Sequence, residues 1–449
     1  MKPPKPPSRR EGASLWARIK LFREDIFRSQ PERLYRAWMA ELRTPFYRCY
    51  TINDPALVRE VLRERPGDFP KHSIIGRTLA PLLGRSVFVT NGVVWEAQRR
   101  IIDPAFQDAR LGASFDAMSA AVADAVARWP EGEADVEALT SHLAADIIFR
   151  TLFSQPITHA DAAATFSAFQ AYQRAQPVLS PLDLLKVPQW VPRGRRRGAE
   201  DAAAIRAPLA RFVATRQQAI AAGKAPDDLA TRIMTTPDPV TGRCFEGADM
   251  VDQVAIFFLA GHETSASVMA WALYLLASHG SVQEVCASEA AGADLTRPAG
   301  LRTLLKLRNV IRETLRLYPP VPVMVREVQA DRRWRGRHIR PGSMVFVSPW
   351  HLQRHERLWE DPDAFLPDRW EEDTPRAAYL PFSAGPRVCP GQGFAQMEIA
   401  LALSALLRKF QIETAGSPPV PVAHLTVRSE PGVWLRFTRR GATGADRSK

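Results

Sequence analysis

Three stretches in the second half of the chain have the hydrophobic pattern of long helices. In residues 250–279, apolar and small side chains recur at spacings of three and four, as on one face of an α-helix, at Val254, Phe257, Phe258, Gly261, Thr264, Ser265 and Val268. Residues 304–317 have the same repeat and stop at Pro319-Pro320, where a helix is expected to end. Residues 392–410 are apolar nearly all round, which is typical of a deeply buried helix.

The rest of the chain predicts further helices and a small amount of sheet. Residues 95–220 are rich in alanine and mostly helical in their repeat. Residues 34–63 and the run at 344–347 contain short apolar stretches bounded by turn residues, as strands do. We therefore predict a mainly α fold, a large helical domain with a small, mostly N-terminal β-sheet portion. The predicted boundaries are a disordered tail at 1–12, a single domain at 13–440 and a disordered tail at 441–449.

The composition narrows the class of protein. Hydrophobic residues make up 46% of the chain and charged residues 24%, as in ordinary globular proteins, and no apolar run approaches the ~20 residues that a membrane span needs. Residues 15–27 mix apolar and basic side chains at helical spacing, so peripheral membrane contact stays open beside ordinary packing. The cysteines contain no CxxC pair, which fits a cytoplasmic protein without zinc or disulfide frameworks. They are Cys49, Cys244, Cys286 and Cys389.

The formal net charge of +12 suggests an acidic partner. The compact basic run at residues 193–197 lies in a loop-like stretch, and a solvated loop is the favoured interpretation. The run has no interleaved aromatic residues and matches no nucleic-acid-binding module. No nucleic-acid partner is therefore expected.

Cys389 is the first candidate for chemistry. It follows Phe382-Ser383-Ala384-Gly385-Pro386-Arg387-Val388, precedes Pro390-Gly391, and stands directly before the predicted buried helix. Amide groups at a helix N-terminus stabilise negative sulfur, so a lowered thiol pKa is expected. Glycines on either side let the backbone pass close to a flat ligand. Taken alone, a single cysteine here is more often a small buried hydrophobic residue.

The segment Ala260-Gly261-His262-Glu263-Thr264-Ser265 is the second candidate. A glycine in a helix interior costs about 1 kcal/mol and so needs a reason. One interpretation is a close helix crossing, with the hydroxyl of Thr264 bonded to a carbonyl one turn back. The other is a local opening for a ligand beside Gly261 and Thr264. His262 is expected to face a neighbouring helix.

Two further pairs are weak signals on their own. Glu313 and Arg316 lie three residues apart on the predicted helix at 304–317 and can form an ion pair. Trp95 and Arg99 place an indole N–H and a guanidinium one turn apart, and both groups can donate to a carboxylate.

Together and in this order, these segments resemble the cytochrome P450 family of haem-thiolate monooxygenases, in its soluble bacterial form. Phe382, Gly385, Arg387, Cys389 and Gly391 are similar to the haem-binding loop, and residues 260–265 to the oxygen-binding helix. Glu313 and Arg316 are followed downstream by Arg369, as in the family's buried charge cluster. The resemblance covers essentially the whole chain except its tails.

The resemblance implies haem b as cofactor, with Cys389 as the axial ligand of the iron. Glu263 and Thr264 would be catalytic and deliver protons. The Glu313, Arg316 and Arg369 cluster would be structural. The other residues expected at the cofactor are Trp95, Arg99, Arg326 and Arg387 as propionate donors, with Phe382, Gly261 and Gly391 beside the haem.

The implied reaction inserts one oxygen atom of O₂ into a hydrophobic organic substrate such as a fatty acid, a terpenoid or a carotenoid. The candidate pocket walls are largely apolar. They are residues 72–83, 171–185, 254–258 and 321–324.

Electrons would come from a separate acidic ferredoxin or flavodoxin, which basic residues on the Cys389 side, such as Arg408 and Lys409, would bind. A monomer is expected. The alternatives are a peroxide-driven peroxygenase or an isomerase, which the Glu263-Thr264 pair disfavours, and a non-catalytic haem sensor or carrier.

Overall fold

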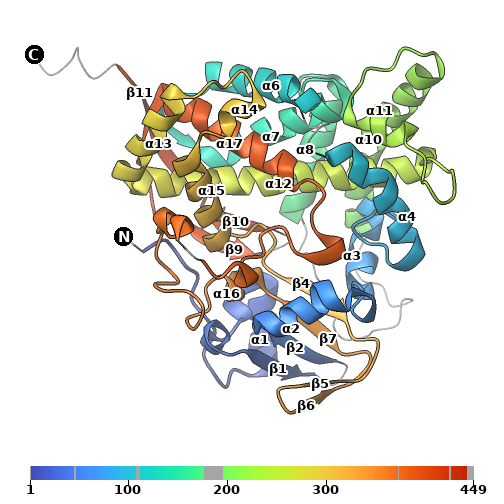
Figure 1. Ribbon diagram of the computed structural model, residues 1–449, viewed down its shortest axis with the longest axis vertical. Helices are drawn as coiled ribbons and strands as arrows, with labels where there is room; N and C mark the ends of the chain where they lie inside the picture. The colour runs from blue at the N-terminus through green and yellow to red at the C-terminus, as the bar shows by residue number, and fades with distance from the viewer. Residues whose placement is uncertain are drawn as a thin grey trace, which may run out of the picture.

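The computed structural model describes residues 2–44, 47–107, 112–175, 196–372, 374–423 and 426–441. Its central element is α12 (Gly247–Ser278), which crosses the helical part of the molecule (Figure 1). This helix begins three residues before the predicted boundary. Residues 248–249 are exposed, so the first turn has no apolar repeat from which a helix could be predicted.

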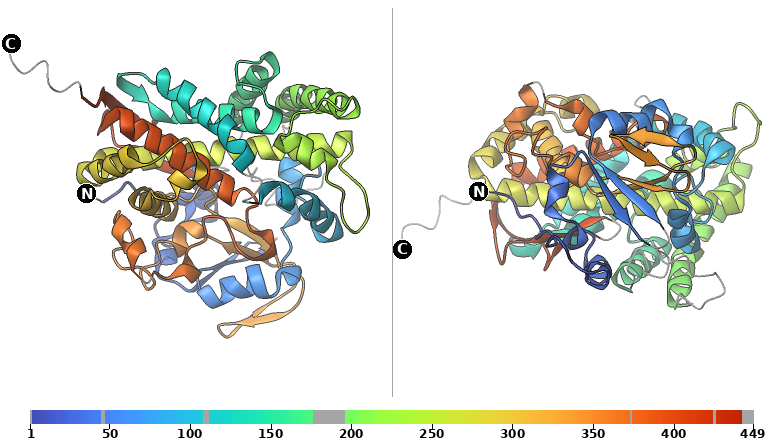
Figure 2. Two further views of the ribbon diagram at one scale, coloured as in Figure 1. Left: turned by 45° about the horizontal axis from the view of Figure 1, so that its top comes forward. Right: turned by 90° about the horizontal axis from the view of Figure 1, so that it is seen from below.

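Four of the described helices make the most extensive helix contacts with α12. They are α7 (Val136–Phe153), α10 (Arg196–Ala221), α15 (Leu305–Leu317) and α17 (Gln392–Lys409). The predicted helices at 304–317 and 392–410 are confirmed to within one residue at each end. Figure 2 shows α17 crossing over α12, so the helix that follows Cys389 is fixed against the helix that carries Thr264.

The remaining described helices surround this centre or cover the sheet. They are α1 (Leu15–Glu24), α2 (Pro55–Arg59), α3 (Ser73–Leu83), α4 (Gly92–Ile102), α6 (Phe115–Ala127), α8 (Ala160–Ala175), α11 (Leu229–Thr235), α13 (Gly280–Gly292), α14 (Pro298–Leu301) and α16 (Pro349–Leu352). None of the described helices combines the length and the apolar composition that crossing a lipid bilayer requires.

The principal sheet joins the N-terminal part of the chain to its later part. Its order is β1 (Met39–Arg43), β2 (Arg48–Ile52), β7 (Met344–Val347) and β4 (Met324–Glu327), with β2 and β7 parallel and the other pairs antiparallel. This sheet lies below the helical layer in Figure 1. The predicted mainly α fold with a small sheet portion is therefore confirmed.

Smaller groups of strands complete the fold. The order β3 (Gly132–Asp135), β11 (Trp434–Arg439) and β8 (Phe410–Thr414) forms a three-stranded sheet. Two antiparallel pairs are β5 (Arg332–Trp334) with β6 (Arg337–Ile339), and β9 (Val420–Ala423) with β10 (Val427–Glu430). β3 interrupts the alanine-rich stretch that is predicted to be mostly helical.

The N-terminal residues, for which a disordered tail is predicted, make defined contacts in the structure. The carbonyl of Pro4 accepts a hydrogen bond from the hydroxyl of Tyr318 at 2.9 Å, and Lys5 forms an ion pair with Asp363 at 3.0 Å. Arg9 forms a parallel bridge with Pro31. These partners lie far along the chain, which is why local composition does not indicate them. Residues 442–449 of the other predicted tail lie outside the described residues.

Glu313, Arg316 and Arg369 form one buried contact. The carboxylate of Glu313 accepts hydrogen bonds from Arg316 Nη2 at 2.7 Å and from Arg369 Nε at 3.1 Å. Arg316 also donates to the carbonyls of Pro362 and Ala364. The three residues therefore fix the irregular segment after α16 against α15, and removing one partner would leave an uncompensated buried charge.

Candidate functional site

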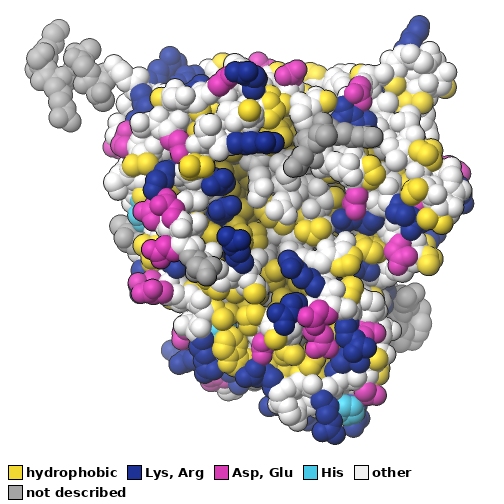
Figure 3. All heavy atoms as spheres, in the orientation of Figure 1, with side chains coloured by type: hydrophobic (Ala, Val, Ile, Leu, Met, Phe, Trp, Pro, Cys, Tyr) yellow, Lys and Arg dark blue, Asp and Glu magenta, His cyan; other side chains and the backbone are white. Residues whose placement is uncertain are grey.

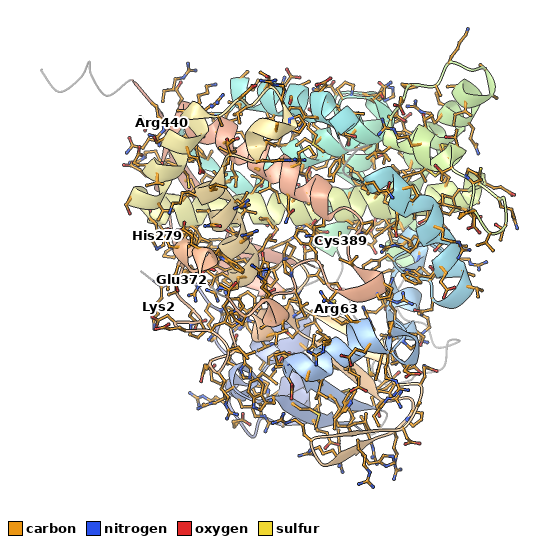
Figure 4. All side chains as sticks on the ribbon, in the orientation of Figure 1. Lys2, Arg63, His279, Glu372, Cys389 and Arg440 are labelled. Atoms are coloured by element: carbon orange, nitrogen blue, oxygen red, sulfur yellow. The ribbon has the colours of Figure 1, made fainter. Side chains whose placement is uncertain are left out.

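Cys389 lies on a loop that is anchored directly before α17 (Figure 4). Its backbone N–H donates to the carbonyl of Phe382 at 3.0 Å. Gly385 in the same loop has φ +69°, and a Cβ at this position would lie 1.9 Å from the carbonyl oxygen of Leu62. Only glycine fits there, so the Cys389 loop is held against the segment Glu60–Glu64.

The Cys389 side chain is accessible even though protein surrounds it, as expected for a group that lines an internal space. Burial raises the pKa of the Cys389 thiol, while the backbone N–H of Gly391 and the charge of Arg99 lower it by less. The sequence-based expectation of a lowered pKa is wrong for the protein alone, because loss of hydration outweighs the local amide. A bound metal reverses this balance, since a coordinating thiol is deprotonated.

Beside this loop, α4 supplies two of the expected donors. Arg99 Nη1 donates to the carbonyl of Val388 at 2.8 Å, so this arginine contacts the residue next to Cys389. The guanidinium of Arg387 lies 4.2 Å from the ring centroid of Trp95 and donates to Asn91 Oδ1 at 2.9 Å. The structure thus brings Trp95, Arg99 and Arg387 together.

Arg326 lies with these donors, as expected. Lys71 lies there too, although no sequence motif indicated it. The two residues form an antiparallel bridge. Arg326 is 6% exposed, and its guanidinium donates to the carbonyl of the adjacent Val325. Burial and then the charge of Arg387 lower the pKa of Arg326 to about 10. Burial, followed by the charges of Arg387, Arg326 and Arg99, lowers the pKa of Lys71 well below its ordinary value.

This cation cluster (Lys71, Arg99, Arg326 and Arg387) has too little negative charge around it. Oδ1 of Asp103 lies 2.6 Å from Arg99 Nε. Burial lowers the pKa of Arg387, and the charge of Glu96 raises it by less. Among the described residues, no acidic group offsets the charge of Lys71 or Arg326. Buried cations need an anionic partner, so the cluster fits a ligand with two carboxylates, such as the propionates of haem.

An apolar cavity of about 370 Å³ reaches the middle of α12. Ala260, Glu263 and Thr264 line it, and Thr264 Oγ1 donates to the carbonyl of Ala260 at 2.6 Å. Three of the predicted pocket walls contribute, at 72–83, 254–258 and 321–324, whereas most of 171–185 lies outside the described residues. N-terminal residues that were not predicted, including Phe22 and Leu42, also line the cavity.

Gly261 and His262 of the α12 motif face away from this cavity. A Cβ on Gly261 would lie 2.7 Å from Ile148 Cδ1 of α7, which supports the interpretation of a close helix crossing. His262 is buried, its Nδ1 lies 2.9 Å from the carbonyl oxygen of Phe258, and its ring packs against Phe169 of α8. Burial lowers the pKa of His262 to about 4. His262 is therefore neutral near pH 7 and faces its neighbouring helix, as expected.

Glu263 and Ser265 have partners that no motif indicated. One oxygen of Glu263, Oε1, accepts from Thr426 Oγ1 at 2.6 Å and from Arg428 Nη2 at 2.9 Å. Ser265 donates to Glu398 on α17. Burial raises the pKa of Glu398 to about 8, so this carboxyl is largely protonated at neutral pH. A charged residue type inside an otherwise apolar helix was the sequence signal for Glu398.

Comparisons with known proteins agree with this geometry. Residues 20–435 match the family model described as cytochrome P450. Cyclooctat-9-en-7-ol 5-monooxygenase from Streptomyces melanosporofaciens is 30% identical, with 85% of this chain and 83% of the relative covered. Protein LUTEIN DEFICIENT 5, chloroplastic, from Arabidopsis thaliana is 28% identical (87% and 70% covered), and cytochrome P450 4d8 from Drosophila melanogaster 27% (94% and 97%). This chain belongs to the cytochrome P450 family and is a haem-dependent monooxygenase.

Proposed function

We propose that this monooxygenase oxidises a hydrophobic substrate of the fatty-acid, terpenoid or carotenoid class. The observation that carries the proposal is the apolar cavity that reaches Thr264. Its charged lining residue on α12, Glu263, is already paired with Arg428, so the inner end offers mainly apolar surface. Burying such a substrate would exclude water from Ala260 and Thr264.

Haem, when bound, supplies an iron centre that activates O₂ with electrons and protons delivered to it. Cys389 would supply the thiolate that binds the iron, with Phe382 and Gly391 beside the sulfur. Gly261, which was expected beside the haem, instead packs against Ile148 of α7. The cation cluster together with Trp95 would hold both propionates. Residues 13–440 would act as one cytoplasmic, monomeric domain, and the family match over residues 20–435 supports this extent.

Replacing Lys71 by methionine should weaken retention of the haem. The substitution removes the ammonium group of Lys71, which donates to the carbonyls of Val87 and Phe88 and lies among the other cations of the cluster. Hydrogen bonds to charged groups contribute about 1.5–3 kcal/mol, which corresponds to roughly tenfold or more in the rate of haem loss. Transfer of haem to excess apomyoglobin measures this rate. Lys224→Met, at an exposed position, is the matched control. Equal rates for Lys71→Met, Lys224→Met and the unaltered protein would exclude Lys71 from the haem site.

Thr264 and Glu263 would handle protons on the substrate side of the haem. The Thr264 hydroxyl lines the cavity and donates to the Ala260 carbonyl, which leaves its oxygen lone pairs turned toward other donors. Glu263 lines the same cavity one residue earlier. The pair can therefore receive a proton at the carboxylate and pass one from the hydroxyl.

Thr264→Ala should uncouple electron consumption from product formation. Without the hydroxyl, we expect product per electron pair to fall by roughly a hundredfold, the lower range for loss of a positioned proton donor, while hydrogen peroxide accounts for the missing electrons. Thr264→Ser keeps the hydroxyl and should retain most of the coupling. Full coupling in Thr264→Ala, together with efficient turnover on peroxide alone, would favour the peroxygenase alternative.

An acidic ferredoxin or flavodoxin would deliver the electrons on the Cys389 side. Arg408 and Lys409, named from the sequence, are poor candidates for its binding. They donate to the carbonyls of Ala290 and Val126, at the far end of a helix of 18 residues that rises about 27 Å. The basic patch proposed instead consists of Arg63, Arg308, Arg312 and Arg376.

The contacts of this basic patch support a location around the Cys389 loop. Arg63 is exposed, and its segment packs against Gly385–Arg387. The segment Arg376–Ala378 packs against the adjoining α2. Burial and the like charges of Arg308 and Arg376 lower the pKa of Arg312, so these arginines lie close together. Figure 3 shows basic side chains beside a hydrophobic hollow on the face where Figure 4 labels Cys389 and Arg63.

Neutralising two members of the basic patch should slow reduction by an acidic partner. For the double variant Arg63→Gln with Arg308→Gln, we expect reduction at low salt to be about tenfold slower, which lies within the range of electrostatic steering. At high salt the charges are screened, so the rates of the double variant and of the unaltered protein should become equal. Stopped-flow reduction by a [2Fe–2S] ferredoxin measures this rate. Arg333→Gln, on the exposed side of β5, is the control. A loss of rate that is equal at all ionic strengths would contradict the proposed docking face.

A further inference from the structure

The β9–β10 pair is attached to α12 at the residue that the proposed function treats as the proton-carrying acid. Ser267 Oγ donates to the carbonyl of Val427 at 2.6 Å. One helical turn earlier, Glu263 accepts from Thr426 and Arg428. Thr426 also lines the substrate cavity. The residue that enters β10 (Val427–Glu430) therefore forms part of the wall beside Glu263.

The two oxygens of Glu263 are in different situations. Oε1 accepts from Thr426 Oγ1 at 2.6 Å, from Arg428 Nη2 at 2.9 Å and from Arg428 Nε at 3.2 Å. Oε2 is buried and accepts no hydrogen bond from any group that the structure describes. One oxygen is thus fixed by a cation and a hydroxyl, and the other is the available acceptor for a proton.

Arg428 also connects this buried carboxylate to the outside. The side chain of Glu263 is 7% exposed, whereas that of Arg428 is 33% exposed. Within the described part of the chain, Arg428 is the cation that forms an ion pair with Glu263. Two N–H groups of the Arg428 guanidinium, Nε and Nη2, converge on the same oxygen of Glu263, and this restricts the orientation of the carboxylate more than a single hydrogen bond would.

We infer that Arg428 is a positioning residue for proton transfer: with Thr426 it fixes Oε1 of Glu263 and directs Oε2 toward proton exchange. The inference rests on the proposed proton role of Glu263 and Thr264. No bond other than that to the transferred proton is made or broken, because Arg428 keeps its own protons throughout. Nothing in the oxygen-binding motif of α12 points to a residue on β10.

Two other titratable groups face this pair. His262 is adjacent to Glu263, and burial keeps its ring neutral near pH 7. Glu137, at the start of α7, accepts from Ser429 Oγ at 2.7 Å and lies within the electrostatic range of Arg428. Burial raises the pKa of Glu137, and Ser429 and Arg428 lower it by less. Arg428 therefore faces two carboxylates, and Glu137→Gln should leave its contact with Glu263 intact.

The test combines infrared titration of the haem-loaded protein with measurement of coupling. Protonated carboxylic acids have a distinct carbonyl stretch, and the band of Glu263 is the one that Glu263→Gln removes. In Arg428→Gln the pH midpoint of this band should rise by about 1–3 units, because a buried carboxylate loses its opposite charge. Product per electron pair should fall by roughly tenfold at neutral pH, because the loss of positioning removes part of the rate enhancement that a general acid supplies.

Three variants separate positioning from a general loss of structure. Arg428→Lys keeps the charge and should restore the pH midpoint but only part of the coupling, since the flexible lysine ammonium lacks the fixed fork of N–H donors that a guanidinium directs at Oε1. Arg436→Gln, which removes an exposed arginine from the nearby β11, should change neither quantity. If Arg428→Gln does not fold, Thr426→Val should still shift the midpoint upward by a smaller amount.

The outcomes distinguish this inference from the function on which it rests. If Glu263→Gln uncouples turnover but Arg428→Gln and Thr426→Val alter neither midpoint nor coupling, the inference about Arg428 is wrong and the proton role of Glu263 stands. If Glu263→Gln itself remains fully coupled, the proposed proton role of Glu263 fails. An upward shift in Arg428→Gln that Arg428→Lys reverses supports Arg428 as the positioning residue.

Discussion

The positive charge buried beside Cys389 is the constraint on which the rest of the structure depends. Arg326 is buried and Lys71 partly buried next to Arg99 and Arg387, with no acidic group among the described residues to offset them. Burial of such charge is costly without an anionic partner. Because Arg99 also donates to the carbonyl next to Cys389, one bound dianion would satisfy the cations and fix the sulfur together.

The fold meets this constraint by joining segments that are far apart in the sequence. Gly385 lets the Cys389 loop touch the backbone at Leu62, and β4 places Arg326 beside Lys71. On the other side of the site, α12 separates the substrate cavity from α17, and β10 brings Arg428 to Glu263. Arg99, Arg387 and Glu263 are therefore each held by a part of the chain other than their own helix or loop. Loss of one distant segment would change both the charge and the geometry at the centre.

The long helices and the main site motifs could be predicted because their signals are local. The repeat of α12, the proline stop of α15 and the glycine-bounded loop at Cys389 all lie within one window of sequence. Arg428 and Lys71 could not be predicted, since their partners lie far away: Glu263 is 165 residues from Arg428. The direction of the pKa shift of the Cys389 thiol was predicted wrongly for the same reason. The effect of the helix N-terminus can be inferred from the local sequence, whereas the loss of hydration depends on tertiary packing.

The most direct test of the account is the absorption spectrum of the reduced protein with bound carbon monoxide, compared across the four cysteines. The account predicts a Soret band at the position of thiolate-ligated haem, which Cys389→Ser abolishes. The same spectrum should persist in serine variants of Cys49, Cys244 and Cys286, of which Cys49 and Cys286 are buried and Cys244 is exposed. A thiolate-type band that survives in Cys389→Ser, or is lost with another cysteine instead, would contradict the assignment of Cys389 as the haem ligand.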